Sequence, residues 1–242
     1  MKHLYFITLF TLLLACPILG AKPVKKVDKV YTLSMGSPKS WLPIAKLLYK
    51  EISNYIPHTQ FKVHHYPHGR VLKDIRNKVI DGDIGWQAPI PPEFKAHLIS
   101  TQTPLTILTM TVITNNPELF YGKDWQDLAS LKIAFPRGAS YVHKDLPRSA
   151  YNQVGYLENG FKMLKLGRVH GVMTTHQNFA KVLRKSKDKS LTAVKHLDFP
   201  IILRPVFHKD HWQLRDQVEK AIQKMRSDGV YNRIFKKTGI KL

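Results

Sequence analysis

The stretch VYTLSMGSPKSWLPIAKLLYKEISNYIPHTQFKVHHY, residues 30–66, contains the signals for a strand, a helix and a second strand in that order. Val30–Met35 has the composition of a strand and ends at a Gly-Ser-Pro turn. A helix is predicted from Pro43, because proline is favoured in the first helical turn, and Pro57 ends it. The apolar residues of this helix recur on one face: Ile44, Leu47, Leu48, Ile52 and Tyr55. Phe61–Tyr66 is the second strand.

The same alternation continues along the chain. Further strands are predicted at Ile84–Gln87, Thr103–Thr114, Leu131–Phe135, Val169–Met173 and Ile201–Phe207. A further helix is predicted at Gln177–Arg184. Three more are indicated by sets of apolar residues at helical spacing: Val71, Leu72, Ile75 and Val79; Leu157, Phe161 and Leu164; and Leu214, Val218, Ala221, Ile222 and Met225. A short turn is expected at Tyr231–Lys237. Strands that alternate with amphipathic helices predict an α/β fold with largely parallel sheets.

The N-terminus has the pattern of a secretory signal. Lys2 and His3 precede an apolar stretch from Leu4 to Ala15, which is shorter than the roughly 20 residues that a membrane-spanning helix needs. We therefore expect residues 1–21 to be a signal peptide and residues 22–29 a basic linker. The expected location is the periplasm.

Two processing routes stay open. Cleavage near Gly20 or Ala21 would release a soluble protein, whereas Leu13–Cys16 resembles a bacterial lipobox in which Cys16 would be lipid-modified and become the new N-terminus. Cys16 is the single cysteine of the chain, so no intramolecular disulfide is expected.

The composition is strongly basic, with 38 lysine and arginine residues against 17 acidic ones and a net charge of +21. A basic protein of this kind can bind nucleic acid, but export argues against that partner, and the charges are dispersed along the chain. A general positive field instead favours anionic ligands and anionic envelope surfaces.

Four segments resemble motifs of one protein family, in the order and spacing of that family. They are Arg70–Gly85, with its Asp81-Gly82-Asp83 turn; Trp125–Ser140, with LKIAFPRGAS from Leu131; Leu164–Val172, which reads LKLGRVHGV; and Met225–Tyr231, which reads MRSDGVY. Together they resemble the extracellular solute-binding proteins of family 3, the two-lobed periplasmic binding proteins. The resemblance spans nearly all of the chain after the signal peptide.

This resemblance implies two α/β lobes joined by two crossing strands, with a ligand enclosed between them. The implied first lobe is 28–110 plus 205–242, the second is 111–204, and the crossing strands lie near 109–114 and 200–207. It further implies a monomer that binds a small solute and delivers it to an inner-membrane permease of the ABC type, or reports it to a receptor. The chain ends soon after the last expected element, so no attached kinase or enzyme domain is expected.

Ligand contacts are expected in the loops after the strands, because ligands of open α/β sheets sit beyond the carboxyl ends of the strands. The candidates are Ser37, Trp41, His68, Arg70, Trp86 and Gln87 from the first lobe, and Arg137, Gly138, Ser140, Tyr141, Thr175 and His176 from the second. Arg137 offers a planar charged fork for an oxyanion, beside backbone N–H groups that suit a carboxylate or phosphate. Core packing is the alternative role for the two tryptophans, and a solvated surface position is the alternative for the arginines.

The sequence departs from the amino-acid-binding members of the family in two places. The stretch Ser100–Pro104 lacks the arginine that the family uses to clamp a carboxylate, and Met173–His176 lacks the acidic residue that holds an amino group. A buried cationic amine without a counter-ion would be costly. These departures favour a polar uncharged or anionic solute, and they leave open a cleft that no longer binds a transported solute.

Other functional classes have weaker support. Some proteins of this fold dehydrate small acids, but Glu93 is the single carboxylate expected near the cleft, and the sequence contains no catalytic motif. A sensory module without a transport role is a further alternative. His64 and His65 point to opposite faces of a strand, and His208 and His211 fall on a surface turn, so we expect no metal and no cofactor.

Overall fold

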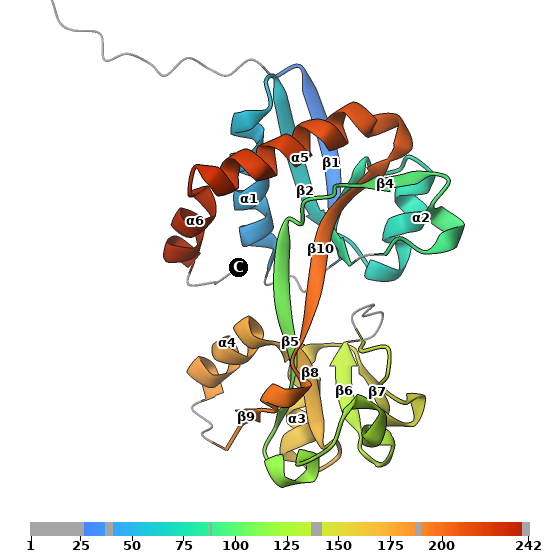
Figure 1. Cartoon of the computed structure of the whole chain (residues 1–242), viewed down its shortest axis with the longest axis vertical. Coiled ribbons are helices and arrows are strands. Elements are labelled where there is room, and N and C mark those ends of the chain that lie inside the picture. The colour runs from blue at the N-terminus through green and yellow to red at the C-terminus, as the bar shows by residue number, and fades with distance from the viewer. Residues whose placement is uncertain (1–26, 37–40, 88, 137–141, 187–189, 239–242) are drawn as a thin grey trace, which may run out of the picture.

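A computed structural model describes residues 27–36, 41–87, 89–136, 142–186 and 190–238. Its strands and helices confirm the predicted α/β class, with two groups of elements connected by two strands (Figure 1). The upper group contains the parallel strands β1 (Lys29–Met35), β2 (Thr59–His65) and β3 (Gly82–Gln87), and β1 lies between the other two.

Two helices follow the strands of the upper group. Helix α1 (Leu42–Tyr55) has Pro43 in its first turn and buries Ile44, Leu48 and Ile52 on the face that the spacing predicts. Helix α2 (Val71–Arg76) is shorter than the apolar pattern indicates, and Val79 beyond its end is exposed. The order β1, α1, β2, α2, β3 is therefore the one that residues 30–87 predict.

The lower group repeats this arrangement. Its parallel strands are β6 (Ile133–Pro136), β7 (Tyr151–Val154) and β8 (Gly171–Thr175), with β6 between the other two. Helix α3 (Leu157–Lys165) follows β7, and α4 (His176–Ser186) follows β8 directly. Gly171 on β8 lies where a Cβ would collide with the side chain of Val112. Its close approach to this neighbouring residue therefore requires glycine.

Two long antiparallel strands connect the groups. Strand β5 (Thr106–Thr114) pairs with β8 below, β10 (Phe199–His208) pairs with β3 above, and the two strands pair with each other from Thr106 to Met110. The sheet therefore runs without interruption in the order β2-β1-β3-β10-β5-β8-β6-β7. The short strands β4 (Leu98–Ser100) and β9 (Thr192–Ala193) lie off this path and pair with the central strands β10 and β5, respectively.

Each group has its own hydrophobic core. The upper core includes Leu33, Ile52 and Phe207, and the lower core includes Phe120, Phe135 and Met173. Short 3-10 turns at His68–Arg70, Pro92–Phe94, Pro117–Phe120, Trp125–Ser130, Arg148–Ala150, Lys195–Leu197 and Lys209–His211 complete the connections. No helix within the described ranges is long and apolar enough to cross a membrane.

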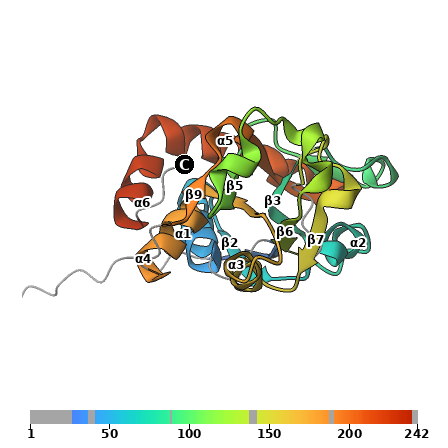
Figure 2. The ribbon, with the colours of Figure 1, turned by 90° about the horizontal axis from the view of Figure 1, so that it is seen from below.

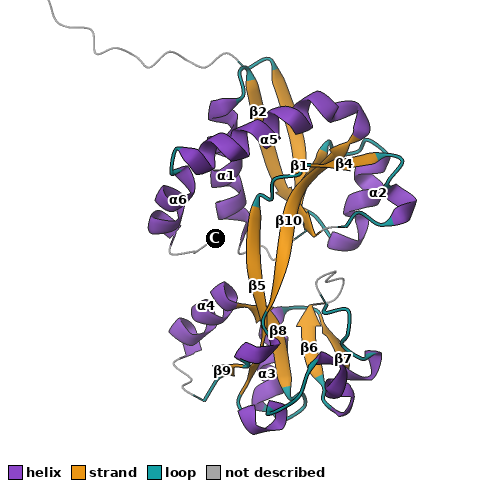
Figure 3. Ribbon diagram, in the orientation of Figure 1, coloured by secondary structure: helices purple, strands orange, loops and turns teal. Residues whose placement is uncertain are grey.

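The C-terminal helices belong to the upper group (Figure 3). Helix α5 (Trp212–Ser227) buries the predicted apolar face against α1. The segment predicted as a short turn is instead helix α6 (Val230–Thr238), whose Tyr231 and Ile234 are buried in the upper core. In Figures 1 and 2, α6 and α4 lie on one side of the molecule and α2 on the other.

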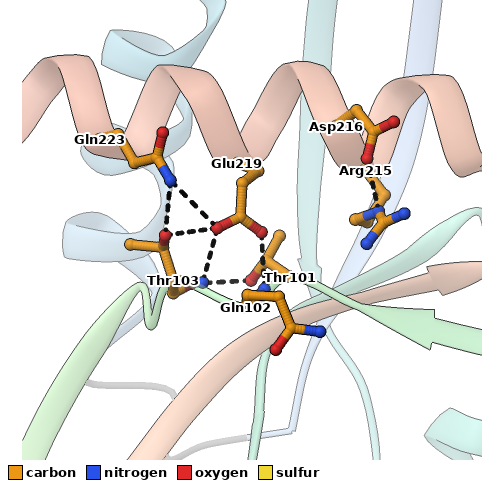
Figure 4. Close-up of polar contacts among 7 residues, drawn as sticks. All are labelled: Thr101, Gln102, Thr103, Arg215, Asp216, Glu219 and Gln223. Carbon is orange, nitrogen blue, oxygen red and sulfur yellow. Dashed lines mark hydrogen bonds and ion pairs between the residues drawn. The ribbon is translucent and has the colours of Figure 1, made fainter.

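Glu219 on α5 holds the turn that leads into β5 (Figure 4). Its carboxylate accepts hydrogen bonds from the backbone N–H groups of Gln102, at 2.6 Å, and of Thr103, at 2.7 Å, and from the hydroxyl of Thr103. Burial raises the pKa of Glu219, but these hydrogen bonds outweigh it and hold the pKa below its ordinary value. This contact fixes the upper end of a connecting strand to the helical layer.

We predict that Glu219→Gln lowers the free energy of unfolding by about 1–2 kcal/mol, because hydrogen bonds to a charged acceptor are lost at a partly exposed site. Since the pKa is lowered, the contribution is present at neutral pH and disappears as the pH falls below the ordinary glutamate value of 4.5. Urea unfolding at pH 7 and near pH 3 measures it. Glu118→Gln, at an exposed glutamate, is the control, and equal effects of the two substitutions would contradict the prediction.

Candidate ligand-binding cleft

A pocket lies between the two groups of elements and is lined by both. The upper group contributes Gly36, Trp41, His68, Gly85 and Gln87; the lower group contributes Pro136, Leu157, Thr174, Thr175 and Asn178; and the connecting strands contribute Leu108, Met110, Ile201 and Leu203. The parallel strands deliver these residues, because β1, β3, β6 and β8 all end at this cleft. The location is the one expected for a ligand of an α/β sheet.

Trp41 joins the two sides of the cleft. It lies immediately before α1, and its indole N–H donates a hydrogen bond to the side-chain oxygen of Asn178 on α4, at 3.4 Å. The ring also packs against both the upper and the lower core. Trp41 therefore combines the two roles that the sequence left open, core packing and cleft lining.

His68 and Trp86 form a stacked pair on the upper wall. Their ring centroids are 4.4 Å apart and their planes differ by 11°. His68 lines the pocket, whereas Trp86 is 8% exposed and packs in a hydrophobic cluster with α2. Burial lowers the pKa of His68, so its imidazole is neutral at pH 7. A side chain at Gly36 would collide with the His68 ring.

Two predicted cationic contacts lie outside the lining. The side chain of Arg70 is 72% exposed, and its guanidinium is 3.7 Å from the carboxylate of Asp74 on the next helical turn. His176 is 2.8 Å from Asp198, with which it shares a hydrogen bond. Its neighbour Thr175 does line the pocket, and the Thr175 hydroxyl accepts a hydrogen bond from the backbone of Asn178 at the start of α4.

Asp83 is a buried carboxylate behind the upper wall that the sequence reasoning missed. It accepts hydrogen bonds from the Ser34 hydroxyl, at 2.7 Å, and from the backbone N–H of Gly85, at 2.9 Å, with a further backbone hydrogen bond from Gly36. Burial raises the pKa of Asp83 to about 6, although the three hydrogen bonds oppose this rise. The carboxylate thereby fixes the ends of β1 and β3 at the edge of the cleft.

Two lining residues carry buried polar atoms that have no hydrogen-bond partner within the described ranges. They are the side-chain oxygen of Gln87 at the end of β3 and the hydroxyl of Thr174 near the end of β8. Gln87 is one of the predicted ligand contacts, but Thr174 and Asn178 are not. The expectation that ligands contact the ends of strands also applies to Thr174, because it directly precedes Thr175 at the end of β8.

Several predicted residues lie outside the described ranges. These are Ser37, Arg137, Gly138, Ser140 and Tyr141 among the ligand candidates, together with Cys16. Within the described ranges, no group of three or more His, Cys, Asp or Glu side chains is placed to hold a metal ion.

No protein-family model matches the sequence, and no curated protein matches it. Solved structures do match in fold. The ligand-binding core of GluR0 from Nostoc punctiforme, in complex with L-glutamate, gives a TM-score of 0.67 at 13% identity over 86% of this chain and 98% of that one. The chain has the fold of two-lobed ligand-binding proteins.

Two further matches have the same fold. A mutant of ArgBP from T. maritima gives a TM-score of 0.66 at 15% identity, covering 86% of this chain and 94% of that one. The probable amino-acid ABC transporter extracellular-binding protein ytmK from Bacillus subtilis gives 0.65 at 18% identity, covering 88% and 97%. The coverage shows that the two-lobed fold accounts for nearly the whole of those chains.

We predict that Asp83 makes stability depend on pH in a direction opposite to that of most carboxylates. A raised pKa means that the folded state binds the proton more tightly, so stability falls as the pH rises from 3.8 to about 6. That interval corresponds to about 3 kcal/mol. Denaturant unfolding of the wild type and of Asp83→Asn across this range measures the effect. The free energy of unfolding of the wild type minus that of Asp83→Asn should fall as the pH rises. A difference that is constant with pH would contradict the prediction.

Proposed function

We propose that this chain is an exported solute-binding protein whose two lobes close on a small polar or anionic solute. The observation that carries the proposal is the pocket shared by both lobes and the connecting strands, spanned by the hydrogen bond from Trp41 to Asn178. The complex of the GluR0 ligand-binding core with L-glutamate supports a binding function, as does the similarity to ytmK, a probable amino-acid ABC transporter extracellular-binding protein.

The proposed mechanism is closure about β5 and β10. A ligand that contacts Gln87 above and Thr174 below would bind the closed arrangement more tightly than an open one, and so would shift the population toward closure. In this proposal the first lobe is 28–110 plus 205–242, the second is 111–204, and the hinges lie near 109–114 and 200–207.

The proposed site of action is the periplasm, with residues 1–21 as the export signal and 22–29 as a linker. An ABC-type permease is the proposed recipient of the solute, a receptor is the alternative, and the binder acts as a monomer. The mass of the mature N-terminus separates the two processing routes, because lipid-modified Cys16 begins one product and is missing from the other.

We predict that protein purified from its own envelope carries a small-molecule ligand that native mass spectrometry detects. Unfolding in denaturant should release the ligand, and its return should reduce the radius of gyration measured by small-angle X-ray scattering, because closure brings the lobes together. A preparation that carries no ligand, and whose radius responds to none of the metabolites of its envelope extract, would contradict the proposal.

A further inference from the structure

The floor of the cleft is apolar. Leu108 and Met110 from β5 and Ile201 and Leu203 from β10 line it side by side, because these stretches of the two strands pair with each other. A molecule that lies on this floor gains free energy by covering apolar surface. The floor therefore suits a ligand with an apolar body.

The polar lining within the described ranges carries no formal charge. Gln87, Thr174, Thr175 and Asn178 are neutral side chains, and His68 is neutral because burial lowers its pKa. No Lys, Arg, Asp or Glu is among the described lining residues. Arg70, one of the predicted cationic contacts, is exposed and lies beside Asp74. A charged ligand group that packs against these described residues would lose its hydration without gaining a counter-ion from them, which is costly.

Two backbone N–H groups of the upper wall are not free to bind an anion. The N–H groups of Gly36 and Gly85, both in lining residues, already donate to Asp83. An anion placed against this wall would meet a carboxylate behind it. The same carboxylate cannot form a direct ion pair with a ligand cation, because Asp83 is 2% exposed and its oxygens already accept three hydrogen bonds.

Two polar atoms of the lining residues have no partner in the part of the chain that the structure describes. The side-chain oxygen of Gln87 needs a donor, and the hydroxyl of Thr174 can donate or accept. Buried polar groups are almost always hydrogen-bonded in folded proteins, and a ligand in the pocket can supply what the chain does not. Because Gln87 belongs to the upper wall and Thr174 to the lower, one ligand that satisfies both would hold the two walls together.

We infer that the ligand of this cleft is an uncharged molecule with an apolar body, which donates a hydrogen bond to Gln87 and forms another with Thr174. This inference rests on the proposed solute-binding function and narrows its ligand class, from polar or anionic to uncharged. It assigns Gln87 the role of the specificity-determining residue on the upper wall.

A matched panel of small molecules at pH 7.5 tests the charge of the ligand. N-acetyl-leucinamide, nucleosides and cyclic dipeptides form the uncharged group. N-acetyl-leucine and nucleoside monophosphates form the anionic group. Isopentylamine, an alkylamine that is fully protonated at this pH, forms the cationic group, and free leucine is the zwitterion. Native mass spectrometry and thermal shift report binding by unliganded protein. Binding confined to the uncharged group is expected.

Binding confined to anions, and abolished by Arg137→Ala, would overturn the inference while leaving the binding function intact. Preferential binding of isopentylamine or leucine would overturn it equally. If no molecule of the panel binds and the envelope-purified protein also carries no ligand, the proposed function fails and the inference fails with it. If the envelope-purified protein does carry a ligand, the charge of that ligand decides.

Gln87→Leu tests the assigned residue. We expect at least a tenfold loss of affinity for the uncharged molecule that binds best. The melting temperature of the unliganded protein should not fall, because the substitution removes a buried polar atom that has no partner among the described residues. Arg70→Ala is the matched control and should leave affinity unchanged. Loss of affinity in Arg70→Ala but not in Gln87→Leu would overturn the assignment.

Discussion

The rest of the structure depends on the antiparallel pairing of β5 with β10. The chain passes between the two groups of elements through these strands, and their pairing makes one continuous sheet out of two parallel ones. Because β10 also pairs with β3 and β5 also pairs with β8, the strand ends of both groups are brought to the same cleft. The apolar residues of the pairing, such as Met110 and Ile201, thereby become the floor of the pocket.

Asp83 sets the chemistry of the upper wall from behind it. A carboxylate with no access to water must be satisfied by fixed donors, and here the donors come from Ser34, Gly36 and Gly85. The same bonds hold the end of β1 against β3 and use the backbone N–H groups of two lining glycines. One buried residue thus fixes the wall and limits which ligand groups it can receive.

Much of the fold follows from the sequence, because the elements at residues 30–87 combine clear periodicity with proline and glycine boundaries. Helix α6 was predicted wrongly as a turn: nine residues are too few for a stable isolated helix, and packing of Ile234 into the upper core supplies what the local sequence does not. Strand β7 was missed because Tyr151–Val154 is short and mostly polar, and its pairing with β6 defines it.

The site is only partly predictable for a similar reason. Strand ends can be located from the sequence, and Gln87 and Thr175 follow from that rule, but the direction of a side chain depends on its tertiary neighbours. The guanidinium of Arg70 lies beside the carboxylate of Asp74, and the side chain of Asn178 accepts a hydrogen bond from Trp41 of the opposite lobe. The net charge of +21 is equally uninformative about the ligand, because exposed charges are screened by salt within about 10 Å. What a closed cleft can hold is decided by the few groups that line it.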